Sequence, residues 1–176
     1  MHAFRTVLAD YGANRGYLIS TAGFQSGAWQ AAQSSNVALV SWEELQRQFF
    51  DRWLNVMGNR LAEKADRVFP YLVALIADSK GRYQHWTDER KAEYADLDFK
   101  YGMFGDAVSH SAKPKRFKKV FPLIVADPDS NLRDRYGVEL RSYREYFDFA
   151  LPLADKTLVD FQGFFKDEKH QPWEWP

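Results

Sequence analysis

The sequence predicts an α/β segment at the start of the chain, followed by an all-helical region of long helices. Two observations carry this prediction. Residues 1–50 alternate between helical patterns and two short apolar runs that are typical of buried strands. From Ser41 onward, apolar residues recur at steps of three and four, which is typical of amphipathic helices. We therefore expect two domains, residues 1–50 and residues 51–176.

Helix and strand patterns alternate in the first of these segments. The expected elements are a helix over 2–11 that ends at Gly12, a strand over 16–20, an alanine-bearing helix over 24–34 and a strand over 37–40. A strand–helix–strand order with short connections implies a parallel pair joined by a crossover helix. Two strands alone make a marginal sheet. We therefore expect the open edge beside the first strand to be covered by a helix or to pair with another chain.

The helical region begins at Ser41. Glu44 follows three residues later, which is the capping-box pattern, and the apolar face then continues through Leu61. Pro70 is expected to break this helix, with a buried helix after it. Further along the chain we expect a helix over 88–101, a polar basic loop over 109–119 and a helix over roughly 132–165.

Composition excludes several classes of protein. Because cysteine is absent, disulfides, zinc–cysteine sites, iron–sulfur clusters and cysteine nucleophiles are excluded. Lys+Arg and Asp+Glu are 24 each, so the chain as a whole has no net attraction for nucleic acid. The sequence has no apolar run long enough for a spanning helix and no secretory pattern at its start. We therefore expect a cytoplasmic protein without a membrane segment.

Residues 3–50 carry a specific succession of features. Gly16 leads into an apolar strand that ends in Ser20-Thr21, and a glycine–phenylalanine turn follows at Gly23-Phe24. An alanine-bearing helix, a second apolar strand and an acidic helix start come next. This succession resembles the C-terminal half of the catalytic domain in Mrr-like restriction endonucleases, which belong to the PD-(D/E)xK nuclease superfamily.

The resemblance implies a restriction-endonuclease-like sheet and a role in magnesium-dependent DNA cleavage, in defence against foreign or modified DNA. In that family, the metal-binding Asp and the (Glu/Gln)-x-Lys lie on strands that precede the helix that here begins at His2. We therefore expect a truncated form of the fold, with no catalytic residue, metal or cofactor of its own. Such a chain would not cleave alone, and a second copy or a companion chain would complete its sheet.

Two sets of residues are candidates for DNA contact. Ser20, Thr21 and Gln25 lie between a strand end and a helix start, where free backbone N–H groups favour anions. The segment 113–119 holds five cations in seven residues, which could contact phosphates. These cations are Lys113, Lys115, Arg116, Lys118 and Lys119. The alternative interpretation is a turn that merely caps a helix and a solvated loop between helices.

A second hypothesis concerns a different class of protein. Under it, the chain is a non-catalytic helical module for protein interaction or oligomerisation, without nuclease ancestry. The two hypotheses differ over residues 13–45, where a parallel strand pair with a crossover helix favours nuclease ancestry and a hairpin opposes it.

Overall fold

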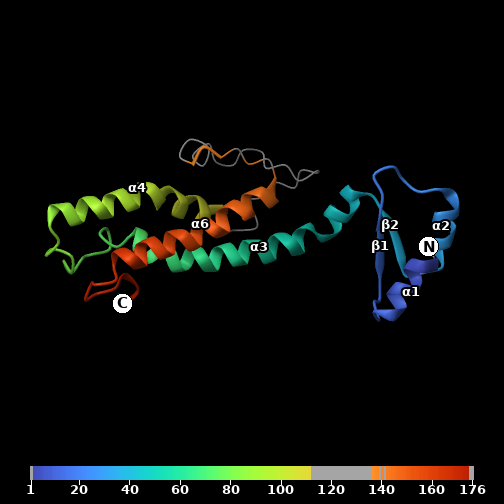
Figure 1. Cartoon of the computed structure of the whole chain (residues 1–176), viewed down its shortest axis with the longest axis horizontal. Coiled ribbons are helices and arrows are strands. Elements are labelled where there is room, and N and C mark those ends of the chain that lie inside the picture. The colour runs from blue at the N-terminus through green and yellow to red at the C-terminus, as the bar shows by residue number, and fades with distance from the viewer. Residues whose placement is uncertain (1, 112–135, 139, 141, 175–176) are drawn as a thin grey trace. The chain divides into compact units, whose positions relative to one another are not determined.

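The computed structural model describes residues 2–111, 136–138, 140 and 142–174, and Figure 1 shows their course. The chain divides into two compact units. The described part of the first unit is residues 2–52, and the second unit begins at Trp53. None of the described helices has the length and apolarity needed to cross a membrane.

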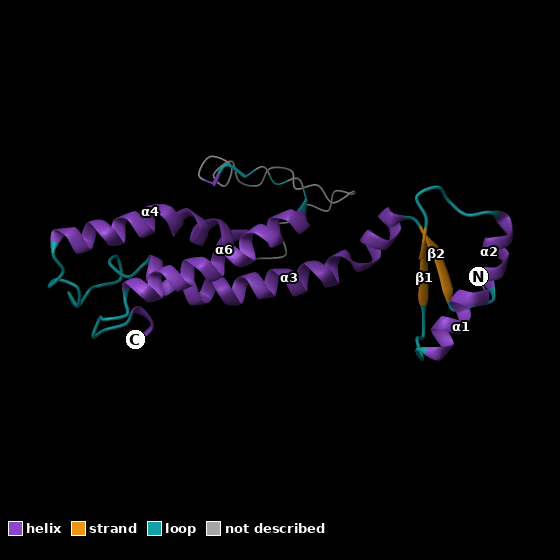
Figure 2. Ribbon diagram, viewed as in Figure 1, coloured by secondary structure: helices purple, strands orange, loops and turns teal. Residues whose placement is uncertain are grey.

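The first unit contains two parallel strands and the helix that connects them (Figure 2). Its elements are α1 (His2–Asp10), β1 (Gly16–Ile19), α2 (Ser26–Gln33), β2 (Val37–Val40) and the start of α3 (Trp42–Leu72). The strands pair in parallel, with Gly16 opposite Val37 and Ile19 opposite Val40. The predicted fold class, a parallel pair with a crossover helix followed by long helices, is confirmed.

A small apolar core lies between the sheet and the first two helices. Its buried members are Leu8 of α1 and Val37 and Leu39 of β2. The partly buried side chains that pack against them are Phe4, Ala13, Leu18, Phe24, Ala28 and Ala32. Alternate residues of a strand share a face, so α1 and α2 both cover the face that carries Leu18, Val37 and Leu39.

Gly12 ends α1, as the sequence predicts. Its φ is 62°, a left-handed conformation that glycine adopts without steric cost. The Gly12 N–H donates to the carbonyl of Ala9, and the Ala13 N–H donates to the carbonyl of Leu8. This pair of bonds is a Schellman motif, and it directs the chain from α1 toward β1.

The predicted capping box opens α3. The Glu44 N–H donates to Ser41 Oγ at 3.1 Å, and the Ser41 N–H donates to Glu44 Oε2 at 2.7 Å. The two contacts satisfy two of the N–H groups that a helix start leaves without partners.

The predicted helix break at Pro70 is wrong, because α3 continues through Pro70 to Leu72. Pro70 lies in the last turn, so its missing N–H removes one helical hydrogen bond near the end of the ladder. Val68, Tyr71 and Leu72 on either side of it are buried in the core of the second unit. This packing outweighs the lost bond, and the segment that follows, residues 73–77, is turns rather than a buried helix.

The second unit packs α4 (Asp88–Ser111) and α6 (Tyr143–Phe164) with the remainder of α3 (Figure 1). The ring centroids of Trp53 and Phe147 are 5.5 Å apart and those of Tyr71 and Phe165 are 5.6 Å apart, so α3 and α6 run in the same direction. Tyr94 contacts Phe165, whereas Tyr101 contacts Phe161. Helix α4 therefore runs antiparallel to α6.

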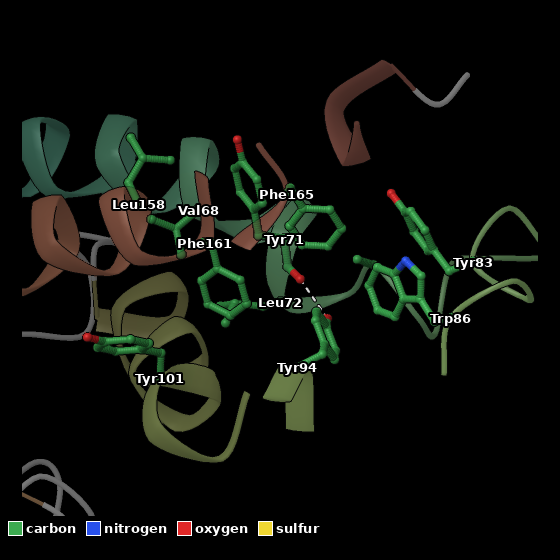
Figure 3. Packing of buried hydrophobic residues seen from close by; sticks show 11 residues of the cluster. Val68, Tyr71, Leu72, Tyr83, Trp86, Tyr94, Tyr101, Leu158, Phe161 and Phe165 are labelled. Carbon is green, nitrogen blue, oxygen red and sulfur yellow. Dashed lines mark hydrogen bonds between the residues drawn. The ribbon is translucent and has the colours of Figure 1, made fainter. Parts of the chain in front are cut away.

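Aromatic rings dominate the core of this unit (Figure 3). Phe161 of α6 and Phe165, which caps its end, lie among Tyr71, Tyr83 and Tyr94, and each of these five side chains is less than 5% exposed. The Tyr94 hydroxyl donates to the carbonyl of Tyr71 at 2.6 Å, which satisfies a polar group inside the apolar cluster.

Two boundaries in this unit differ from prediction. Residues 109–111 belong to α4 rather than to a loop, and 112–119 lie outside the described residues. The last long helix begins at Tyr143 rather than near Leu132. Ser142 and Glu145 form a capping box there, which fixes the helix start, and Gly137 ahead of it has a left-handed φ of 63°.

Candidate nucleic-acid interface

The carboxyl ends of β1 and β2 lie at the same edge of the sheet, because the strands are parallel. Ser20 and Thr21 follow β1 at this edge, and Ser41 follows β2. Gly23, with a φ of 83°, turns the chain toward Gln25, which precedes α2 in an extended conformation. The N-termini of α2 and α3 thus both follow one sheet edge, where helix N–H groups and dipoles favour negative charge.

The structure brings together the three candidates that follow β1. The Ser20 N–H donates to the carbonyl of Val40, and Ser20 Oγ accepts from the Ala22 N–H, both at 3.2 Å. Ser20 therefore holds the turn. Thr21 and Gln25 are exposed, and the Gln25 side chain makes no capping hydrogen bond to α2. Their side chains are accessible to a ligand.

The first turns of the two helices differ in charge. Helix α2 has no acidic residue in its first turn, whereas α3 has Glu43 and Glu44. Hydrogen bonds from the backbone and side chain of Ser41 lower the pKa of Glu44, so this carboxyl is ionised at neutral pH. An anion would therefore be favoured at α2 and opposed at α3.

The carboxylates at this edge do not fit a magnesium site. Glu44 is engaged in the cap of α3, and Glu43 accepts a charged hydrogen bond from Arg47 at 2.5 Å. Within the residues that the structure describes, no group of three or more His, Asp or Glu side chains is placed to hold a metal ion.

Trp29 of α2 is not among the candidate residues for DNA contact that the sequence predicts. It lies one turn after Gln25 on α2, is half-exposed, and contacts Phe24 edge-on with ring centroids 5.9 Å apart. The sequence feature that could have indicated Trp29 is its aromatic side chain in a helix of otherwise small and polar residues. An exposed indole beside polar groups can stack on a base or an apolar partner.

Tyr17 makes a second set of contacts that the sequence analysis missed. Its hydroxyl accepts a hydrogen bond from Gln48 Nε2 at 2.7 Å, and its ring contacts Phe49 edge-on at 5.3 Å. The Arg15 guanidinium lies 5.5 Å from the centre of the same ring. The start of α3 therefore packs on the sheet face opposite α1 and α2, beside a cation.

The five cations of the basic segment, Lys113, Lys115, Arg116, Lys118 and Lys119, lie outside the described residues. Their contact with DNA stays a prediction.

The fold of the first unit agrees with a comparison against known protein families. Residues 1–49 match a family model described as restriction endonuclease. The match spans α1, β1, α2, β2 and the start of α3. Comparisons with curated proteins and with solved structures gave no match. The first unit therefore contains a restriction-endonuclease-like region.

Proposed function

We propose that this chain is a restriction-endonuclease-family protein that acts on DNA, in defence against foreign or modified DNA. The observation that carries the proposal is the family match over residues 1–49, which coincides with a parallel strand–helix–strand unit. Residues 1–50 would form the nuclease-derived domain, and residues 51–176 a helical domain for DNA engagement, oligomerisation or sensing.

Two parts of the chain are each proposed to contact DNA. Thr21, Gln25 and the first N–H groups of α2 would hydrogen-bond a phosphate, while Ser20 keeps the turn in place. These groups carry no positive charge, and we assign the electrostatic attraction for phosphates to the cations at 113–119. In DNA-binding proteins, basic side chains typically supply affinity, and backbone N–H groups fix the position of the protein on the DNA.

We also propose that the chain does not cleave DNA by itself. The family resemblance implies a magnesium ion held by carboxylates, and the carboxylates at the strand ends here serve the start of α3 instead. A companion chain would have to bring the metal-holding groups.

A salt titration of DNA binding tests the contact. We expect affinity for a labelled duplex to fall steeply with salt, and the slope to decrease by about two in a Lys115→Ala/Arg116→Ala variant. The matched control, Lys166→Ala/Lys169→Ala, changes two exposed cations elsewhere and should leave the slope unchanged. Equal slopes in all three proteins would contradict the assignment of 113–119 as a phosphate contact.

The helical unit carries a feature that favours a second candidate function, protein interaction. Val56, Phe99 and Val159 are 53%, 73% and 64% exposed on α3, α4 and α6. Substituting Phe99 and Val159 with serine separates the candidates. A loss of partner binding with DNA binding intact would favour the interaction module.

A further inference from the structure

Strand β1 presents an open edge. The N–H groups of Gly16 and Ser20 donate to the carbonyls of Asn36 and Val40, so these residues bond toward β2. Successive residues of a strand point their N–H and C=O groups to opposite sides. The backbone groups of Tyr17 and Ile19 therefore face the other edge, where the described part of the chain supplies no neighbouring strand.

The open edge of β1 lacks the sequence features that usually prevent an exposed strand from pairing with another chain. Exposed edges are typically guarded by a lysine, a proline or a bulge. No Asp, Glu, Lys, Arg, His or Pro occurs between Gly16 and Trp42, although charged residues are 27% of the whole chain. Neither electrostatic repulsion nor a missing N–H opposes pairing along β1.

The face beside the open edge is apolar. Ile19 is 47% exposed, and Phe49, which packs on Tyr17, is 39% exposed. Among the described residues, the apolar cluster between the sheet and the helices α1 and α2 has only three buried members, Leu8, Val37 and Leu39. A two-stranded sheet with so small a core gains much from further strands and from covering these side chains.

We propose that β1 pairs antiparallel with β1 of a second copy of this chain, about a two-fold axis at Leu18. In this register, Tyr17 lies opposite Ile19 of the second copy, and these are the residues whose backbone groups face the edge. The result is a continuous four-stranded sheet in the order β2–β1–β1–β2.

The register brings no like charges together and places apolar side chains on apolar side chains. Arg15, the cation nearest the strand, falls opposite the uncharged Thr21 of the second copy, so no like charges meet. Ile19 and Tyr17 share one face of the strand, and each Ile19 would pack on the Tyr17 and Phe49 pair of the second copy. A closed, isologous contact of this kind produces a dimer rather than a filament. The proposal does not depend on DNA binding.

A proline at position 19 tests the backbone pairing. Ile19→Pro removes an N–H that faces the open edge while leaving the bonds to β2 in place. By light scattering, the wild-type chain should have twice its mass of 20.5 kDa. Ile19→Pro should be monomeric at the same concentration, and Ile19→Ala, which keeps the N–H, should still dimerise, about tenfold more weakly. A monomeric wild type, or an Ile19→Pro dimer as tight as wild type, would overturn the proposal.

A single cysteine tests the register. Residues that face each other across such an axis without exchanging hydrogen bonds have Cα atoms about 4.5 Å apart, which a disulfide can bridge. The chain has no cysteine of its own, so Leu18→Cys should give a covalent dimer on mild oxidation and Trp29→Cys should not. A folded Leu18→Cys protein that stays monomeric, or equal cross-linking of both variants, would overturn the register. If Leu18→Cys fails to fold, the position 19 variants still decide the pairing.

Discussion

Gly16 lies so close to Leu8 that no other residue fits between α1 and β1 without movement. A Cβ at Gly16 would lie 2.6 Å from Leu8 Cδ1 and 2.7 Å from Phe4 Cε1. These distances are far below van der Waals contact. The glycine that leads into the first strand therefore sets how closely α1 packs on the sheet.

Gly16→Ala should destabilise the first unit. The added methyl forces Leu8 and Phe4 apart, and overpacking of this kind costs about 1–3 kcal/mol. Urea unfolding followed by tryptophan fluorescence measures the effect. The control is Gly27→Ala in α2, where a Cβ meets no heavy atom within 4 Å and no loss is expected. Equal stability of the two variants would show that α1 does not pack as described.

Ser41→Ala should weaken the start of α3. The substitution removes the hydroxyl that accepts from the Glu44 N–H, and loss of such a cap costs about 1 kcal/mol. Chemical denaturation of the full chain measures the difference from wild type. Ser26→Ala, at the exposed first residue of α2, is the matched control. A Ser41→Ala protein as stable as this control would contradict the capping role.

The same cap should be visible in an acid titration. Hydrogen bonds with Ser41 hold the folded-state pKa of Glu44 below its ordinary value of 4.5. The stabilisation they give is therefore present above pH 4.5 and is lost as pH falls through the lower folded-state pKa. Ser41→Ala keeps the backbone N–H that is the larger cause and removes the hydroxyl, so the Glu44 pKa should rise only part of the way toward its ordinary value in an NMR titration. An unchanged Glu44 titration would contradict the contribution of the Ser41 hydroxyl.

Asp160→Asn should loosen the packing of α4 on α6. Asp160 accepts from the Tyr101 hydroxyl and pairs with Lys100 and Lys156, and these contacts lower its pKa below the ordinary 3.8, the Tyr101 bond most of all. We expect a loss of about 1–3 kcal/mol at neutral pH. Because the pKa is depressed on folding, this difference should shrink as pH falls below 3.8.

A control substitution at another carboxylate distinguishes the loss of the Asp160 contacts from a general change in charge. Asp167→Asn alters an exposed residue after α6 and should leave stability nearly unchanged at every pH. If Asp160→Asn behaves like Asp167→Asn, the Tyr101 hydroxyl and the lysines do not stabilise the ionised Asp160.

Local signals predicted the first unit well. Gly12, the apolar runs and the Ser41–Glu44 pair each act within a few residues, so the sequence alone reveals them. The course of α3 through Pro70 was not predictable in this way. It depends on the burial of Tyr71 against α6, which lies far along the chain.

The candidate site was predictable in part for the same reason. Parallel strands place their carboxyl ends at one edge, so Ser20, Thr21 and Gln25 could be located from the order of elements. The hydrogen bond between Tyr17 and Gln48 joins residues 31 positions apart, so no local sequence pattern predicts it. The start of the last helix was misplaced because Tyr136 and Leu140 continue the helical spacing ahead of the Ser142 cap.

We propose that the restriction-endonuclease-like region of this chain acts on DNA and does not cut it unaided. Purified full-length chain incubated with modified and unmodified plasmid in magnesium tests it most directly, with binding followed in parallel by gel shift. The account predicts a salt-sensitive complex and an intact plasmid. Efficient cleavage that EDTA abolishes would contradict it.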